Sequence, residues 1–287
     1  MRQSGSRRTH IIMPLYQAII LAIVQGLTEF FPVSSSAHLI VIPEFLHWED
    51  GGLVFDVALH VGTLAAVIIY FFKDWVQIIA NGLGFSYQGS RPDERSRSLL
   101  WYLVIGTIPG AIAGWKLDQY AEHAWRSPYI IGTAAVLIAI YMAVADRMPQ
   151  EKQGLDQMNW AAAIAVGVSQ AFAIIPGVSR SGSTIATARF CHLDREAAAR
   201  FSFLLSTPII FGAAAKKFYD IHKEGGVPPG MRLPYVVGIL VSAIVGIVVI
   251  AFFLKYMRRN SLAVFVWYRV IFGIMVVALA VLFRIRG

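Results

Sequence analysis

A carboxylate, three hydroxyls and an imidazole lie within ten residues near the start of the chain, at Glu29, Ser34–Ser36 and His38. Gln25 precedes Glu29 by four residues, so both side chains share one face if this segment is helical. An ionised carboxylate is costly in so apolar a segment and rarely lacks a function there. The group suits general acid–base catalysis, nucleophilic catalysis or the binding of a hard cation. The simpler alternative is a helix end capped by serines, with Glu29 hydrogen-bonded to a neighbouring helix.

A second polar segment, from Pro176 to Thr184, combines glycines, hydroxyls and one arginine in the order PGVSRSGST. Its glycines let the backbone approach a ligand closely, and Arg180 offers a planar fork of N–H groups suited to phosphate oxygens. Backbone N–H groups of such a turn, and of the helix after it, also attract anions. The segment therefore predicts an anion site. The alternative is that Arg180 pairs with Glu29 without any ligand.

Three other polar positions are interpreted as structural. Asp56 and His60 are four residues apart at the start of an apolar segment, where a helix cap with a buried polar contact is favoured over catalysis. Arg269 lies well inside the last apolar segment, so we expect it to have a structural partner.

The composition of the chain places all these residues in a membrane protein. Of 287 residues, 57% are hydrophobic and 15% are charged, and the mean hydropathy is +0.61. Soluble domains carry about 25% charged residues, so the composition excludes a disordered chain, a disulfide-rich secreted module and an ordinary soluble enzyme. The single cysteine, Cys191, excludes an intrachain disulfide and a multi-cysteine metal site.

The net charge of +8 comes from basic residues that stand mostly beside apolar segments. This placement favours contact with anionic lipid headgroups over nucleic acid as the partner. A basic stretch also precedes the first apolar segment, but no convincing cleavage site follows it. We therefore expect this segment to belong to the mature protein.

Eight apolar segments predict an all-α polytopic membrane protein with about six transmembrane helices. A span needs about 20 apolar residues. The candidate spans are Leu53–Phe72, Leu99–Leu117, Tyr129–Ala145, Phe201–Ala215, Tyr235–Leu254 and Leu262–Phe283. The other two segments, 11–31 and 160–175, run into the serine-rich loops and then become apolar again. Irregular backbone at membrane depth must lie inside protein, so we interpret both as re-entrant helical hairpins.

The two loops also match each other after a shift of 145 residues. Identical residues then align at Gln25 and Gln170, Val33 and Val178, Ser34 and Ser179, Ser36 and Ser181, and Ile40 and Ile185. We predict one membrane domain, residues 1–287, made of two repeat halves of about 11–146 and 147–287. An odd number of crossings in each half makes the repeat inverted, an architecture with binding sites where broken helices meet.

The chain resembles the undecaprenyl-diphosphate phosphatase family, also called the bacitracin-resistance protein family. The family's first motif is an acidic residue or Gln, then Glu, then Pro-Val-Ser-Ser and a His, matched here from Gln25 to His38. Its second motif, Pro-Gly-x-Ser-Arg-Ser-Gly-x-Thr, is matched from Pro176 to Thr184. The similarity continues through Phe201–Leu205 and covers nearly the whole chain.

The resemblance implies a phosphatase of the bacterial cytoplasmic (inner) membrane that converts undecaprenyl diphosphate to undecaprenyl phosphate and phosphate. This reaction recycles the lipid carrier for peptidoglycan and other envelope polymers. The resemblance also implies a divalent cation, Mg²⁺ or Ca²⁺, and a site open to the periplasm or exterior. Membrane lipids are expected partners, and a homodimer is compatible with these expectations. Many members have Glu at the position of Gln25, so Glu29 would carry more of the metal-ligand role here.

A mechanism follows as a hypothesis. Arg180 would hold the phosphoryl oxygens with the help of Ser34, Gly177, Ser179, Ser181 and Thr184. A cation near Glu29 and Gln25 would bridge the diphosphate. Ser35 is the preferred nucleophile with His38 as its base, but attack by His38 or by a water that it activates stays open. The rival function is a lipid or small-anion transporter or flippase that uses the same cavity.

Overall fold

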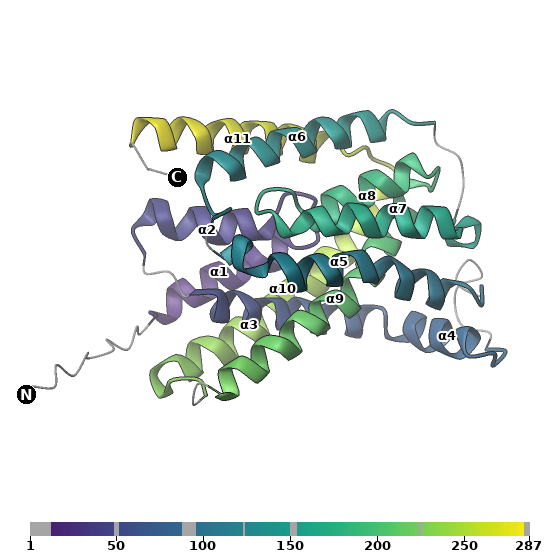
Figure 1. Cartoon of the computed structure of the whole chain (residues 1–287), viewed down its shortest axis with the longest axis horizontal. Coiled ribbons are helices and arrows are strands. Elements are labelled where there is room, and N and C mark those ends of the chain that lie inside the picture. The colour runs from purple at the N-terminus through teal and green to yellow at the C-terminus, as the bar shows by residue number, and fades with distance from the viewer. Residues whose placement is uncertain are drawn as a thin grey trace, which may run out of the picture.

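The computed structural model describes residues 13–48, 52–87, 96–122, 124–149, 154–223 and 226–283, and these residues are helical with no strand. The α-helices are α1 (Leu15–Thr28), α2 (Ser35–Leu46), α3 (Gly52–Tyr70), α4 (Phe72–Gly82), α5 (Leu99–Glu122), α6 (Pro128–Asp146), α7 (Trp160–Ala171), α8 (Arg180–Phe190), α9 (Arg195–Lys223), α10 (Arg232–Met257) and α11 (Ala263–Leu282). Three short 3₁₀ helices are η2 (Leu155–Gln157), η3 (Phe172–Ile174) and η4 (Pro229–Met231). Figure 1 shows the helices running mostly along one direction.

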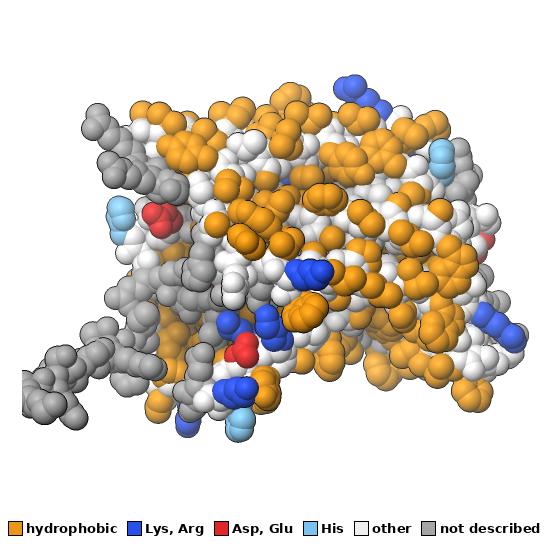
Figure 2. Space-filling view, in the orientation of Figure 1, with side chains coloured by type: hydrophobic (Ala, Val, Ile, Leu, Met, Phe, Trp, Pro, Cys, Tyr) orange, Lys and Arg blue, Asp and Glu red, His pale blue; other side chains and the backbone are white. Residues whose placement is uncertain are grey.

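Five of these helices, α5, α6, α9, α10 and α11, are long and apolar enough to cross a bilayer. A sixth span forms if α3 and α4 count as one, although they are bent by 72° at Phe71. Large apolar side chains cover the outside of the bundle in Figure 2, as contact with lipid requires. The predicted all-α polytopic membrane protein is confirmed.

The two predicted re-entrant hairpins correspond to pairs of short helices that pack on each other. α1 and α2 form the first pair, and α7 and α8 form the second. These helices have 14, 12, 12 and 11 residues, too few for a crossing of about 20 residues. Each pair is interrupted at the serine-rich loop that the sequence singled out, so the polar residues lie at the turn of each hairpin.

The backbone repeats its unusual conformations at the spacing of 145 residues. Among the described residues other than glycine, positive φ occurs at Ser34 (78°) and Ser179 (68°), and at His47 (51°) and His192 (69°). Such φ values are uncommon for these residue types, so two matching pairs are unexpected by chance. These pairs support the predicted repeat, while its inversion and the boundaries of its halves stay predictions.

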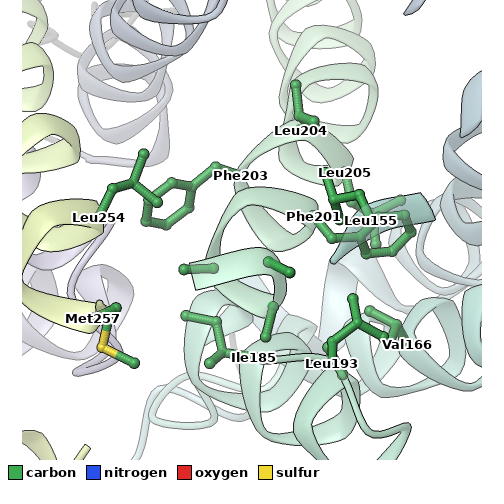
Figure 3. Packing of buried hydrophobic residues seen from close by; sticks show 14 of the residues in the cluster. Leu155, Val166, Ile185, Leu193, Phe201, Phe203, Leu204, Leu205, Leu254 and Met257 are labelled. Carbon is green, nitrogen blue, oxygen red and sulfur yellow. The ribbon is translucent and has the colours of Figure 1, made fainter. Parts of the chain in front are cut away.

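The first arm of each hairpin docks on a helix of the other half. α1 packs on α10, and α7 packs on α5. Gly167 of α7 allows the second contact, because a Cβ there would stand 2.4 Å from the carbonyl oxygen of Gly106. The interior of the bundle is filled by apolar side chains of α8, α9 and α10, including Ile185, Phe203 and Leu254 (Figure 3). This packing fixes both hairpin turns against the middle of α9.

Candidate functional site

The two hairpin turns are in direct contact with each other. The backbone N–H of Gly177 donates to Ser34 Oγ at 3.2 Å, and Ser181 Oγ donates to the carbonyl of Phe31 at 3.2 Å. Ser34 and Ser179 are the residues that precede α2 and α8, so the two helices begin at the same place. The serine-rich loops predicted from the sequence therefore form one polar centre.

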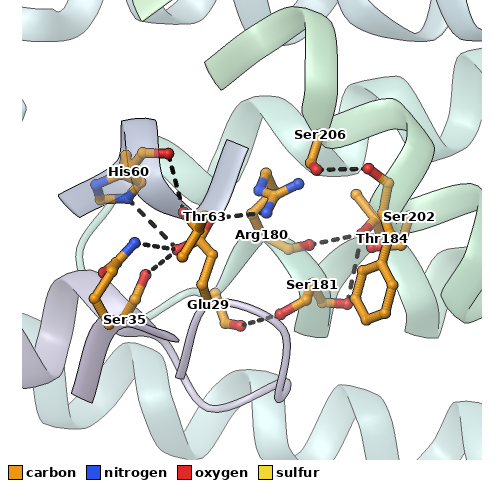
Figure 4. Close-up of polar contacts among 12 residues, drawn as sticks. Glu29, Ser35, His60, Thr63, Arg180, Ser181, Thr184, Ser202 and Ser206 are labelled. Carbon is orange, nitrogen blue, oxygen red and sulfur yellow. Dashed lines mark hydrogen bonds and ion pairs between the residues drawn. The ribbon is translucent and has the colours of Figure 1, made fainter. Parts of the chain in front are cut away.

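Glu29 and Arg180 meet across this centre, as the sequence predicted (Figure 4). Arg180 Nη2 donates to Glu29 Oε1 at 2.8 Å. The Glu29 side chain is 5% exposed and that of Arg180 is 13% exposed. A buried carboxylate needs such a partner, because an isolated ion inside protein is strongly destabilising.

The second oxygen of Glu29 has three further neighbours. Ser35 Oγ donates to Oε2 at 2.5 Å, and Gln25 Nε2 donates to the same atom at 3.1 Å. His60 Nε2 lies 3.5 Å from it. The Glu29 carboxylate is thus contacted by side chains of four helices, α1, α2, α3 and α8.

His60 is a site residue that the sequence interpretation missed. Its Nδ1 lies 2.7 Å from the carbonyl oxygen of Asp56, which can only accept, so Nδ1 carries a proton. With Nδ1 held in this way, Nε2 is the ring nitrogen that faces the Glu29 carboxylate. The spacing of Asp56 and His60 correctly indicated a local contact. Nothing in that spacing indicated that the ring would turn toward Glu29.

His38 does not contact Ser35 in this structure. Its Nδ1 lies 2.7 Å from the carbonyl oxygen of Ser34, its Nε2 lies 2.7 Å from Tyr268 Oη, and its ring stacks on Phe272. Because Ser35 donates to Glu29, the structure adds Glu29 as a candidate base for Ser35, while the predicted role of His38 as base stays a prediction. His38 is held in this direction because its Nδ1 is within hydrogen-bond distance of the Ser34 carbonyl oxygen, one helical turn earlier.

Two residues predicted to bind phosphate have structural contacts. Thr184 is fully buried, donates to the carbonyl of Arg180 at 2.7 Å and lies 2.6 Å from Ser202 Oγ, so its hydroxyl faces α9. Gly177 has a φ of 97°, and a Cβ there would stand 2.4 Å from the carbonyl oxygen of Ile131 on α6. Neither residue lines the cavity described next, and their predicted part in phosphate binding stays a prediction.

A cavity of about 320 Å³ adjoins the polar centre. At one end it is lined by the two hairpin turns and by polar residues around them: Glu29, Ser34, Ser35, Ser36, His60, Gln170, Ser179, Arg180 and Ser181. At the other end it is lined by small and aliphatic residues of α5 and α9: Gly110, Gly114, Ile209, Ile210, Ala213 and Ala214. The cavity therefore suits a ligand with a polar head and an apolar body.

Three side chains at or near the polar centre have buried polar atoms without a hydrogen-bond partner among the described residues. These atoms are Arg180 Nη1, both amide atoms of Gln170, and Gln25 Oε1. A buried group of this kind costs about 1–3 kcal/mol when it is left unpaired. Arg180 thus binds Glu29 through Nη2, while its Nη1 has no partner among the described residues and suits an anion.

The oxygens at the site fit a divalent cation that takes part of its ligands from elsewhere. Glu29 supplies a carboxylate, and the unpartnered Oε1 of Gln25 lies one helical turn away. The part of the chain that the structure describes has no cluster of three or more His, Cys, Asp or Glu residues. Mg²⁺ commonly binds in this way, with one or two carboxylates and with phosphate and water oxygens as the other ligands.

Arg269 of α11 holds the two turns in place. It is fully buried and donates to the carbonyls of Pro32 (3.2 Å), Ala135 (3.2 Å), Gly177 (2.7 Å) and Val178 (3.2 Å). The sequence indicated a structural partner for this arginine. The partners are backbone carbonyls of both turns and of α6, for which a sequence carries no signal.

Two broken helical hairpins that join a carboxylate, an arginine and serines beside a cavity define a polytopic membrane protein with a polar site inside its helical bundle. The family model described as "Bacitracin resistance protein BacA" matches residues 18–275, and the chain belongs to this family. The family resemblance inferred from the two motifs is confirmed.

Relatives of similar length carry one common name. Undecaprenyl-diphosphatase of Pelotomaculum thermopropionicum is 44% identical over 268 residues, which cover 93% of this chain and 97% of that protein. Undecaprenyl-diphosphatase of Desulforudis audaxviator is 45% identical over 267 residues, which cover 93% of this chain and 98% of that protein. The chain therefore matches these relatives over almost their whole length.

Proposed function

We propose that this protein hydrolyses undecaprenyl diphosphate to undecaprenyl phosphate and phosphate, and so recycles a lipid carrier for cell-envelope synthesis. The observation that carries the proposal is Arg180, which binds Glu29 through Nη2 while its Nη1 has no partner among the described residues, at a cavity that Ser35 also lines. The names of the relatives support the same activity.

The binding of the headgroup follows from the polar end of the cavity. Arg180 Nη1 would hold a phosphoryl oxygen, and the hydroxyls of Ser34, Ser179 and Ser181 lie on the same wall. A fixed guanidinium stabilises the negative charge that builds up on phosphoryl oxygens during transfer. The apolar end would take the start of the prenyl chain.

Ser35 is the proposed nucleophile, and Glu29 is the proposed base. Ser35 Oγ would attack the terminal phosphorus and pass its proton to Glu29 Oε2, the atom to which it already donates. The bond from this phosphorus to the bridging oxygen breaks, and undecaprenyl phosphate leaves. A water molecule then attacks the phosphoserine, and the bond from phosphorus to Oγ breaks. Glu29 returns its proton to Oγ, which restores both Ser35 and the carboxylate, and the phosphate leaves with the oxygen and hydrogens of the water.

We also propose Mg²⁺ or Ca²⁺ as a cofactor, held by oxygens of Glu29 and Gln25 together with substrate oxygens. Such a cation would neutralise charge on the diphosphate. The bacterial cytoplasmic membrane and a cavity open to the periplasm or exterior are proposed from the family resemblance. The homodimer stays a prediction.

The test is phosphate release from undecaprenyl diphosphate by the detergent-purified protein, with no gradient present. We expect release by the wild type and a loss of about 100-fold or more in Glu29→Gln and Arg180→Gln. Glu196→Gln is the matched control, because Glu196 pairs with Arg258 away from the cavity and should keep full activity. A wild type that binds the lipid but releases no phosphate would support a transporter or flippase instead.

A further inference from the structure

α5 and α9 pack together along part of their length and then leave a gap beside the cavity. Their facing residues follow each other at intervals of one helical turn. A Cβ built on Gly106 would stand 3.1 Å from Leu205, and one on Gly110 would stand 2.9 Å from Ile209. The helices are thus in close contact at these two levels.

One turn further, the same spacing leads to Gly114 on α5 and Ala213 on α9. A Cβ at Gly114 would meet no atom within 4 Å. Both residues line the cavity, and Ala213 is exposed. Open space at this level, between two helices long enough to cross a bilayer, is where the cavity can open toward the lipid.

Proline stands next to the last closely packed level in both helices, at Pro109 and Pro208. A proline inside a helix removes one backbone hydrogen bond and favours a bend at that turn. Two prolines at matching levels are a structural reason for the helices to separate beyond Gly110 and Ile209.

Gln170 marks the border between the polar end of the cavity and this opening. Its side chain is buried, and both amide atoms lack a partner among the described residues. Its Nε2 lies 3.1 Å from the position of a Cβ on Gly110. The Gln170 amide thus offers one donor and one acceptor between the polar and the apolar lining of the cavity.

We propose that the gap between Gly114 and Ala213 binds the first isoprene units of a prenyl diphosphate and guides the rest of the chain into the bilayer. This inference rests on the proposed function. Gln170 would hydrogen-bond to the phosphate that carries the prenyl chain.

The size of the cavity supports a chain that leaves through the side. A volume of about 320 Å³ is at the small end of ligand pockets, which span about 300–1,000 Å³. It holds a diphosphate and the start of a chain, but a long polyprenyl chain must continue outside. The part of the chain outside the cavity would then lie in the apolar interior of the bilayer.

The test narrows the opening without changing the polar residues. Gly114→Leu adds a side chain where the space is open, and leucine is a better helix former than glycine. Gly212→Leu is the matched control, because its Cβ also meets nothing within 4 Å but Gly212 does not line the cavity. The full chain in detergent is assayed with undecaprenyl and farnesyl diphosphate, and inorganic diphosphate serves as a competing inhibitor.

We expect Gly114→Leu to raise KM for both prenyl diphosphates by about tenfold or more, the range that lost methylene space produces in apolar pockets. The inhibition constant of inorganic diphosphate should stay unchanged, and Gly212→Leu should change neither quantity. Ala213→Phe, which narrows the opening from α9, should act like Gly114→Leu. Unchanged KM in both variants, or an equal rise for inorganic diphosphate, overturns the proposal. Failure of the proposed function is distinct, because the wild type would then release no phosphate.

Discussion

Glu29 is the residue on which the other polar contacts of the site converge. It binds Arg180, Ser35, Gln25 and His60, which come from four helices. The carboxylate can serve as a base for Ser35 only while the other contacts keep it charged and fixed in position. Each of these partners therefore affects catalysis through Glu29.

His60 gives a direct test of this dependence. We expect His60→Leu to lower kcat/KM by about tenfold, because Glu29 loses a polar neighbour at 3.5 Å that helps to hold the carboxylate in position. His60→Gln should keep most of the activity, since its amide can still donate to the carboxylate. Phosphate release by the two variants is compared at equal amounts of folded protein. Equal activity of His60→Leu and the wild type would show that His60 has no role in the site.

A substitution of Gln25 tests whether phosphate release depends on a divalent cation. Gln25→Glu would place a second carboxylate one turn from Glu29, and an added negative ligand strengthens the binding of a hard cation. We expect this variant to need less Mg²⁺ or Ca²⁺ for half-maximal phosphate release than the wild type, and a chelator to abolish activity in both. Activity that persists with chelator would remove the cation from the mechanism.

The elements meet at Arg269, where one guanidinium of α11 binds backbone carbonyls of α6 and both turns. We expect Arg269→Lys to lower the free energy of unfolding by about 3 kcal/mol, because a single ammonium cannot reach the same carbonyls and leaves some unpaired. The measurement is thermal unfolding in detergent. Arg258→Gln removes an exposed pair with Glu196 and should cost no more than about 1 kcal/mol. Similar losses in both variants would contradict the role given to Arg269.

Hydropathy and motif spacing predicted the elements better than the contacts between them. The spans could be predicted from the apolar segments, because burial in lipid depends on composition. The contact between Glu29 and Arg180 could be predicted from the two loops, because a charged side chain inside a membrane protein requires a partner. The break between α3 and α4 was not predicted, since the residues around Phe71 are apolar and include no proline or glycine. The directions of His38, His60 and Thr184 were missed because neighbouring carbonyls and hydroxyls decide them.

The whole molecule is held together mainly by contacts between its two proposed halves. α3 packs on α10, α6 packs on α11, α1 packs on α10 and α5 packs on α7, so each half supplies the docking surface of the other. A half on its own would leave the first arm of its hairpin without its partner helix. Because the apolar contacts join helices of both halves, we expect the two halves to fold as one unit.

This arrangement predicts how a divided chain behaves. Residues 1–149 and 154–287, expressed separately, should each aggregate in detergent, because the apolar faces that dock α1 and α7 remain uncovered. The same two pieces expressed together should co-purify and release phosphate, since Glu29 comes from one piece and Arg180 from the other. Co-purification with Arg180→Gln in the second piece is the control, and it should give an assembled but inactive pair. A first piece that purifies alone as a stable, monodisperse protein would show that the halves fold independently.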